Sequence, residues 1–354
     1  MRSFADLDAV IGRVPSGVVT RFSAIDFGRG SEALYRDQMP GLLTGLADRA
    51  RVQSITASSA IEGVVVADAD RAERIINRRT STLRNRSEQE LAGYRDGQDY
   101  LFQQDWRPLN VGLILHLHRL LFAHTAMHGG AFKTEDNLVV DRSPDGSTTV
   151  RFKPVSAART PLAIEDLIGR YHQAVATGEH HPVLLTGLFI LDLLVIHPFE
   201  DGNGRVARLL TSAILTEHGY TVGCYVSLEQ AVAESADVYY QALLESTHGW
   251  HDGTADPWPW LSYFTNVIAD AYTVFAERAA AAKTPGTKQQ RVREHVLRHS
   301  PVTFRLADIR TAVPGVSDQT IRLVLEQLKN EGKVRADGTG RSATWTRTNT
   351  ALSE

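Results

Sequence analysis

At 354 residues, the chain is long enough for two or three domains and a sizeable hydrophobic core. Its 43% hydrophobic and 22% charged residues are ordinary for a soluble globular protein, and the net charge of −3 indicates no particular partner. The single cysteine, Cys224, excludes an intrachain disulfide and fits a reducing compartment. The first residues contain no basic segment followed by an apolar core, so we expect no secretory signal and a cytoplasmic protein.

The N-terminal third is expected to become helical after an uninformative start. The first forty residues mix polar and apolar residues with scattered Gly and Pro, and we expect them to pack against the body of the fold. Apolar spacing predicts a helix over Gly41–Ala60, and residues 67–102 predict a second, highly charged helical stretch. Arginine is frequent from Arg71 to Arg86. Acidic residues interleave with it, which favours a solvated helical face over a nucleic-acid surface.

Four histidines follow, in and after an apolar helix predicted over Leu113–Phe122. His116 and His118 are two residues apart, so a helix places them on different faces. His124 and His128 have helical i, i+4 spacing, but no third ligand accompanies them and two glycines come next. We therefore expect no zinc site here.

Residues 129–154 change character from helical to β-like. Two short β-like runs flank Ser143-Pro144-Asp145-Gly146, which is a good turn sequence. The segment predicts a β-hairpin.

A strongly apolar segment, Pro182–Ile196, is interrupted only by Asp192. It is too short for a membrane span and predicts a helix buried on most of its surface. A further helix is predicted over Val206–Glu217, with Gly219 placed to cap its C-terminus.

The loop between these two helices, from His197 to Arg208, reads HPFEDGNGRVAR. Gly202 and Gly204 allow backbone N–H groups to approach an anion closely. Arg205 and Arg208 share one face of a helix, whose N-terminus is itself an anion site. This mixture suits a polyphosphate and a divalent metal held beside a base.

An alternative interpretation uses part of the same loop. Gly202, Gly204 and Ala207 satisfy the G-x-G-x-x-A pattern of dinucleotide-binding folds. That pattern requires a preceding strand within a strand–helix–strand unit. The preceding segment is long for a strand and no second β-rich run follows at the needed distance, so we disfavour this interpretation.

The loop resembles the Fic family signature H-x-F-x-[DE]-G-N-G-R-x-x-R at all eight specified positions. Proteins of that family typically transfer AMP from ATP to a hydroxyl group of a target protein. The resemblance, together with the chemistry of the residues, implies that His197 is the general base and that Asp201 is a ligand of Mg²⁺. Phe199 is expected to anchor the loop in the core, and Glu200 to face solvent.

The resemblance also implies how the phosphates are held. Asn203 and the N–H groups around Gly202 and Gly204 are expected to cradle them, while the guanidinium groups of Arg205 and Arg208 meet the outer phosphates. The expected nucleotide-binding residues of the loop are Asp201, Gly202, Asn203, Gly204, Arg205, Val206, Ala207 and Arg208.

Residues 58–63 (SSAIEG) resemble the inhibitory motif [ST]-x-x-x-E-[GN] of many Fic proteins, with Ser58, Glu62 and Gly63 in the specified places. A glutamate at a helix end could pair in bidentate fashion with Arg208. The pair would occupy the arginine that is expected to hold the γ-phosphate of ATP. We therefore expect low activity, and higher activity in Glu62→Gly.

The predicted hairpin would be the flap that, in Fic proteins, lies over the active site and aligns the target segment by backbone pairing. The flap residues nearest the nucleotide would be Asn137, Leu138, Val139 and Val140. Lys133 stands where relatives often have arginine.

Beyond the loop, Val226–Gly249 is predicted to be helical, Trp250–Trp260 to be a loop, and Leu261–Ala282 to be a long helix. Tyr239 and Tyr240 resemble a tyrosine pair that helps to line the base and ribose pocket in relatives. Packing of these aromatic rings against the core is the alternative.

The last segment, from Lys283 to Glu354, has 13 Lys and Arg against 7 Asp and Glu, a net charge of +6 against −9 for the remainder. The predicted order is a helix over Lys288–Arg298, a helix over Leu306–Ala312, a helix over Asp318–Asn330 capped by Ser317, and two β-like runs around Gly338.

This order resembles a winged helix-turn-helix, with Gln319, Thr320 and Arg322 early in the candidate recognition helix. The charge of +6 is modest beside dedicated DNA-binding domains. Winged helices also mediate protein contacts, so DNA binding and a homodimer remain alternatives for this segment.

The predicted fold is mainly α: a Fic-type helical core with a β-hairpin flap and a C-terminal winged helix-turn-helix domain. The expected domains are residues 1–104 with the inhibitory motif, residues 105–282 with the catalytic site, and residues 283–354. The predicted function is ATP- and Mg²⁺-dependent transfer of AMP to a Ser, Thr or Tyr hydroxyl of a target protein or of the chain itself, with no membrane partner. Removal of AMP by the same site, transfer of phosphate or phosphocholine, and a DNA-binding regulator that senses nucleotide are the alternatives.

Overall fold

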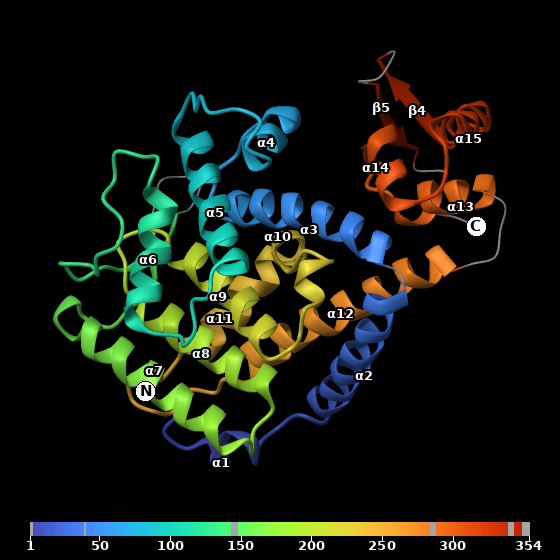
Figure 1. Ribbon diagram of the computed structural model, residues 1–354. Helices are drawn as coiled ribbons and strands as arrows, with labels where there is room; N and C mark the ends of the chain where they lie inside the picture. Colours follow the sequence, from blue (N-terminus) through green and yellow to red (C-terminus); the bar gives the residue numbers. More distant parts are fainter. Residues whose placement is uncertain (1–2, 39, 143–147, 284–287, 339–342, 349–354) are drawn as a thin grey trace.

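Figure 1 shows the computed structural model of the chain, which describes residues 3–38, 40–142, 148–283, 288–338 and 343–348. The elements in chain order are α1 (Leu7–Ile11), α2 (Ser16–Gln38), α3 (Pro40–Ile61), α4 (Ala69–Ile76), α5 (Arg86–Gln103), α6 (Val111–Phe122), β1 (Val139–Arg142), β2 (Thr148–Phe152), η1 (Ala157–Arg159), α7 (Thr160–Thr177), α8 (Pro182–Ile196), α9 (Asn203–Glu217), η2 (Val222–Cys224), α10 (Leu228–Glu234), α11 (Ala236–Thr247), α12 (Trp258–Lys283), α13 (Lys288–Glu294), η3 (His295–His299), β3 (Thr303–Arg305), α14 (Leu306–Ala312), α15 (Asp318–Asn330), β4 (Val334–Asp337) and β5 (Thr344–Arg347). The predicted mainly α fold is confirmed.

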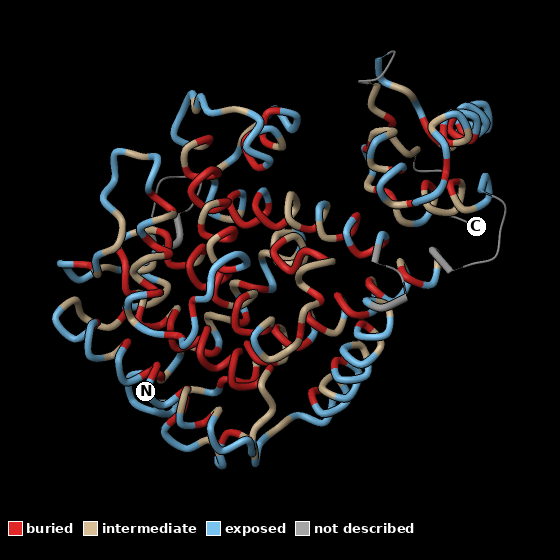
Figure 2. The backbone as a smooth tube through the Cα atoms, viewed as in Figure 1, coloured by how far each residue is buried: buried red, intermediate tan, exposed pale blue. Residues whose placement is uncertain are grey.

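Helix α8 lies at the centre of the larger body, and α7, α9 and α12 pack against it (Figure 1). Its bounds match the predicted apolar segment, and nearly all of its residues are buried, as the colouring of the backbone in Figure 2 shows. Asp192 is fully buried and accepts hydrogen bonds from Ser3 Oγ and Trp250 Nε1, both at 2.6 Å. Within the described ranges, no helix is long and apolar enough to cross a membrane.

For the first forty residues the sequence predicts only packing against the body of the fold, and no helix. They form α1 and the 23-residue helix α2, which packs along α12. Glycines made this helix hard to recognise, since glycine is a poor helix former. Gly28 marks a close approach between the two helices, because a Cβ there would lie 2.5 Å from the ring of Tyr272.

The charged stretch over residues 67–102 is two helices and not one. Helix α4 ends at Ile76, and α5 begins after Asn85, whose side chain accepts a hydrogen bond from the Glu88 N–H at 3.0 Å. The expectation of a solvated arginine face is also wrong at its start. Arg71 is buried and donates to both carboxylate oxygens of Glu88, at 2.6 and 2.8 Å, which fixes α4 against α5.

The predicted hairpin is present as β1 and β2, which pair antiparallel with Val140 opposite Val150. Its predicted turn, Ser143 to Gly146, lies outside the described residues. The expected single helix over Val226–Gly249 is divided into α10 and α11 at Ser235, whose hydroxyl donates to Ala231 O at 2.7 Å.

The C-terminal segment has its own hydrophobic cluster, which includes Phe304, Ile309, Leu325 and Trp345. Helices α14 and α15 have the predicted bounds, and β3, which was not predicted, pairs with β5 in a sheet of order β3-β5-β4. Helix α14 packs on α3, and Figure 1 shows this segment set apart from the larger body on that side.

Candidate active site

The loop from His197 to Gly202 joins the buried helix α8 to α9. His197 ends α8 with its N–H donated to Leu193 O at 3.0 Å and takes left-handed backbone angles, φ 51 and ψ 62. Such angles are rare outside glycine and are found where the surrounding structure enforces them. They turn the chain sharply as it leaves the core.

The His197 ring lies 3.2 Å from Leu194 O through Nδ1. A carbonyl oxygen only accepts, so Nδ1 carries the proton and Nε2 is the basic nitrogen. Burial lowers the pKa of His197 to about 4, and the nearby charge of Lys133 acts in the same direction. The imidazole is therefore neutral at pH 7 and able to accept a proton.

Asn203 braces the loop from inside. Its Oδ1 accepts the Phe199 N–H and its Nδ2 donates to Phe199 O, both at 2.9 Å, and the residue is buried. Both of its polar groups make hydrogen bonds within the loop, and a contact of this side chain with phosphates stays a prediction. Phe199 is fully buried and Glu200 is exposed, as expected.

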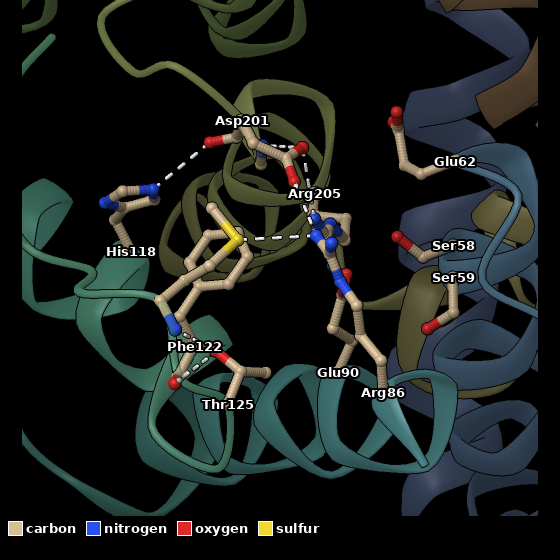
Figure 3. Close-up of polar contacts among 12 residues, drawn as sticks. Ser58, Ser59, Glu62, Arg86, Glu90, His118, Phe122, Thr125, Asp201 and Arg205 are labelled. Atoms are coloured by element: carbon tan, nitrogen blue, oxygen red, sulfur yellow. Dashed lines mark hydrogen bonds and ion pairs between the residues drawn. The ribbon is translucent and has the colours of Figure 1, made fainter.

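Arg205 also has partners within the chain. Its guanidinium is 1% exposed and pairs with the Glu90 carboxylate on α5, with a longer contact of 3.3 Å to Asp201 (Figure 3). Its Cζ lies over the Phe122 ring, 5.2 Å from the ring centroid, within the distance of a cation–π contact. These partners make Arg205 hold α9 to α5, although its Nε has no partner among the described residues. Its contact with the outer phosphates stays a prediction.

Asp201 remains half-exposed next to these buried groups, with 41% of its side chain accessible. Its Oδ1 accepts the Gly202 N–H at 2.6 Å, and its Oδ2 lies 3.7 Å from Arg86 (Figure 3). In the described part of the chain, no group of three or more His, Cys, Asp or Glu side chains could hold a metal. A cation at Asp201 would therefore need ligands from elsewhere, such as phosphate oxygens.

His118 is a site residue that sequence reasoning considered only as a metal ligand. Its Nδ1 accepts the Gly130 N–H at 2.9 Å, so its Nε2 carries the proton and donates to Asp201 O at 3.1 Å (Figure 3). The ring also stacks on Phe199 at 3.8 Å. Histidine spacing alone gave no signal for this role, because its partners lie far away in sequence.

Arg208 faces the end of α3. Its Nε donates to Ser58 Oγ at 2.8 Å, and its Nη2 donates to Ser58 O at 2.9 Å and to Glu62 Oε1 at 2.8 Å. The prediction that Glu62 meets Arg208 is confirmed, but the bidentate geometry is wrong because Ser58 takes two of the donor contacts. Gly63, with φ +76, turns the chain directly after the glutamate.

The Glu62 carboxylate also covers the start of α9. A Cβ at Gly204 would overlap Glu62 Oε1 and approach Arg208 Nη1 to 3.0 Å. A helix N-terminus attracts negative charge. Glu62 therefore occupies an anion position where a phosphate group would be favoured.

A cavity of about 480 Å³ lies beside this anion position. The predicted residues that line it are Glu62, Leu138, Val139, Val140, His197, Gly204, Tyr239 and Tyr240. The structure thus brings together the candidate base, most of the flap and both tyrosines. Val206 lies apart from the cavity, because its side chain is buried and its N–H donates to Gly202 O at 2.9 Å.

Lys133 and Asn137 fasten the base of the hairpin to the loop. Lys133 Nζ donates to Asn137 Oδ1 at 2.8 Å and to Ile196 O at 3.2 Å, and its N–H donates to Pro198 O. Asn137 Nδ2 in turn donates to Phe199 O at 3.1 Å. Burial lowers the pKa of Lys133 to about 8. Asn137 therefore fastens the hairpin to the loop and does not itself line the cavity.

The Fic/DOC family model matches residues 108–215, which include this loop and the hairpin. The chain contains a Fic/DOC family domain over these residues. The chain is 33% identical over 108 residues to proteins named protein adenylyltransferase Fic from Drosophila virilis and Drosophila melanogaster. These matches cover 30% of this chain and 20% of each relative.

Solved structures share the Fic fold over a longer span. A Fic family protein from Desulfovibrio desulfuricans G20 has a TM-score of 0.60 at 19% identity, covering 95% of this chain and 97% of that one. A Fic domain containing signaling protein from Bacteroides thetaiotaomicron has a TM-score of 0.59 at 22% identity, covering 76% of this chain and 98% of that one.

Proposed function

We propose that this chain is a protein adenylyltransferase that moves AMP from ATP to a Ser, Thr or Tyr hydroxyl of a target protein or of itself. One arrangement carries the proposal: a neutral histidine, the start of α9 at Gly204 and a hairpin edge all border one cavity of about 480 Å³, and the Arg208 guanidinium lies next to Gly204. The names of the 33% identical relatives support the same chemistry.

In the proposed reaction, His197 Nε2 removes the proton from the target hydroxyl as its oxygen attacks the α-phosphorus. A new P–O bond to the target forms, the bond to the β-phosphate oxygen breaks, and pyrophosphate leaves. Positioning and charge neutralisation supply most of the rate in such transfers. The first-turn N–H groups of α9 and the Arg208 guanidinium would meet the phosphates once Glu62 has moved away.

Magnesium fits this site only as an ion that arrives with the nucleotide. Asp201 offers a half-exposed carboxylate, and Mg²⁺ commonly binds one or two carboxylates together with phosphate oxygens. The ion would neutralise phosphate charge. Asp201 would hold it, and Arg205 and the Gly202 N–H keep that carboxylate oriented.

The contact of Glu62 with Arg208 supports an autoinhibited resting state. While the Glu62 carboxylate covers Gly204 and pairs with Arg208, the γ-phosphate of ATP cannot bind there. The nucleotide then binds in an unproductive position. Removal of AMP is the alternative use of the same glutamate, which would then orient an attacking water.

Two forms of labelled ATP test the proposed reaction. With Glu62→Gly protein and a cell lysate, label at the α-phosphate should become protein-bound, whereas label at the γ-phosphate should not. Transfer of the γ-label would instead indicate phosphate transfer. Loss of AMP from pre-modified target, faster in the wild type than in Glu62→Gly, would favour removal.

We propose DNA contact through α15 as a second function, because the C-terminal elements follow the order of a winged helix. Gln319 and Arg322 are exposed early in α15, and Thr320 is half-buried beside its cap Ser317. Asp318 pairs with Arg310 at 2.5 Å and lowers the positive charge of this face. Gel shifts of DNA fragments at a stated salt concentration, with wild type and Arg322→Gln, test this DNA contact. Equal DNA binding by the two proteins would contradict it.

A further inference from the structure

The C-terminal segment meets the rest of the chain along the first half of α3, the helix whose far end carries Ser58 and Glu62 (Figure 1). The approach is close, because a Cβ at Gly45 would lie 2.6 Å from Thr311 O on α14. Arg305, which precedes α14, pairs with Asp70 on α4. The two parts are therefore packed against each other and not merely tethered.

A small cavity of about 20 Å³ lies in this joint between α3, α12 and the C-terminal segment. Five basic side chains line it: Arg49 from α3, Arg278 from α12, Arg291 from α13, and His295 and His299 from η3. Its remaining walls are apolar side chains from α3, α12 and α14 and the adjoining Val313. The cavity has space for about one water-sized group and is far below the roughly 300–1,000 Å³ of pockets that bind drug-sized ligands. A phosphate-type ion would therefore require the flexible arginine side chains around it to move outward.

Three polar atoms of these side chains are buried without a hydrogen-bond partner: Arg49 Nη2, Arg291 Nε and His295 Nε2. Buried donors nearly always have a hydrogen-bond partner. A buried donor without one lowers the stability of the folded state by about 1–3 kcal/mol. Three such atoms around one cavity point to an acceptor that belongs to none of these side chains.

Charge leads to the same conclusion. Among the residues that the structure describes, no carboxylate lies within ion-pair distance of Arg49, Arg278 or Arg291. Asp308 and Glu277 act on the cluster only at longer range, and the Asp308 carboxylate accepts the Arg305 N–H at 2.7 Å. The joint thus collects positive charge that its own acids do not neutralise.

The pKa values of the cluster reflect this crowding. Burial, with the nearby charge of Arg49, lowers the pKa of Arg278 to about 10. Burial also lowers the pKa of His295 to about 3, and the charges of Arg49, His299, Arg278 and Arg347 add to the effect. An anion in the cavity would relieve these repulsions.

We propose that this cavity binds one small oxyanion of the phosphate type, held by Arg49, Arg291 and His295 at the joint between α3 and the C-terminal segment. Guanidinium donors match the planar pairs of oxygens that such ions present. His295 contributes a neutral ring whose Nε2 donates when it carries the proton. The bound ion would fasten the C-terminal segment to α3, independently of any reaction at the Fic loop.

Calorimetric titration of the full chain with inorganic phosphate, at constant ionic strength, tests the site. Wild type should bind one phosphate per chain with saturation, and its Tm should rise with phosphate. Arg49→Gln and Arg291→Gln should each weaken binding at least tenfold. Arg170→Gln, which removes the same charge from an exposed pair on α7, should bind like wild type.

The Tm of Arg49→Gln, measured with and without phosphate, distinguishes phosphate binding from a purely structural role of Arg49. We expect Arg49→Gln to keep or raise the Tm measured without phosphate, because it removes an unpaired charge, and to lose the phosphate-dependent rise. A lower Tm with an unchanged phosphate response would overturn the proposal, as would unsaturable binding by wild type. If Arg49→Gln does not fold, Arg291→Gln and Arg49→Lys provide the same comparison, and Arg49→Lys should retain part of the binding.

Two further arms identify the source and place of the signal. Titration with AMP should show no dependence on Arg49, because the cavity has no room for a nucleoside, so AMP affinity lost in Arg49→Gln would contradict the proposed ligand. Phosphate binding lost in Arg208→Gln but kept in Arg49→Gln would place the ion at the start of α9 and overturn the site.

Discussion

Glu62 covers Gly204, since any side chain on residue 204 would overlap the Glu62 carboxylate. The contact joins the end of α3 to the start of α9, two elements far apart in sequence. It places a negative charge on a helix N-terminus next to the Arg208 guanidinium, at 2.8 Å. Whatever occupies this position competes with a phosphate group for the same donors.

Replacing Glu62 by glycine should raise the rate of AMP transfer. A hydrogen bond to a charged group contributes about 1.5–3 kcal/mol, so release of Arg208 should increase the rate roughly tenfold to a hundredfold. The rate of AMP transfer is measured as the incorporation of label from α-labelled ATP into the proteins of one lysate preparation. Glu62→Gln keeps the shape without the charge and should give a smaller increase, whereas equal rates in all three proteins would contradict the autoinhibition.

Gly204→Ala should abolish this gain when it is introduced into Glu62→Gly. A methyl group on residue 204 would project into the cavity beside His197 and hold phosphates away from the N–H groups of α9. We expect at least a tenfold loss of transfer with a Tm close to that of the parent. Full activity in the double variant would show that the phosphates do not approach this turn.

The pair of Glu90 and Arg205 should be a major source of stability. Their side chains are 3% and 1% exposed, and removal of one partner leaves a buried charge. Glu90→Ala is expected to lower the free energy of unfolding by about 3–5 kcal/mol, measured by chemical denaturation. Asp166→Asn, in an exposed pair with Arg170, should change it by about 0.5 kcal/mol or less, and similar effects of both variants would refute the assignment.

Asp192 should make stability depend on pH. Burial raises its pKa to about 6, above the ordinary value of about 3.9 expected when unfolded, and its Oδ2 has no partner. The folded state therefore binds more protons, and stability falls as pH rises from about 4 through about 6.

Asp192→Asn keeps an acceptor for Ser3 and Trp250 but removes the charge. The free energy of unfolding of the variant minus that of wild type should increase by about 3 kcal/mol as the pH is raised from 4 to 7. Denaturation curves at several pH values measure this. A difference between the two proteins that stays constant with pH would contradict the raised pKa.

The sequence predicted best the elements whose signal is local. The apolar run of α8, the capped helix α15 and the hairpin each follow from short patterns, and the loop residues stand within twelve positions of one another. Helix α2 was not predicted, because glycines are poor helix formers. In the structure, Gly28 allows α2 to approach the Tyr272 ring on α12 closely.

Side-chain partners were harder to predict than elements. Arg205 and Asn203 looked available for phosphates, yet one pairs with Glu90 on α5 and the other is used by Phe199. His118 was considered alone, although it supports Asp201 O from α6. Such roles depend on contacts between distant segments, and one sequence read along its length does not contain them.

The central claim is that His197 acts as the base for nucleotide transfer in this loop. The most direct measurement compares α-labelled AMP incorporation by Glu62→Gly with that by Glu62→Gly/His197→Ala, after calorimetry has shown equal ATP binding by both. We predict strong labelling with the histidine and a loss of at least a hundredfold without it, since general-base catalysis contributes about 10²–10⁴-fold. Equal labelling by the two proteins, or no labelling by either with ATP bound, would contradict the account.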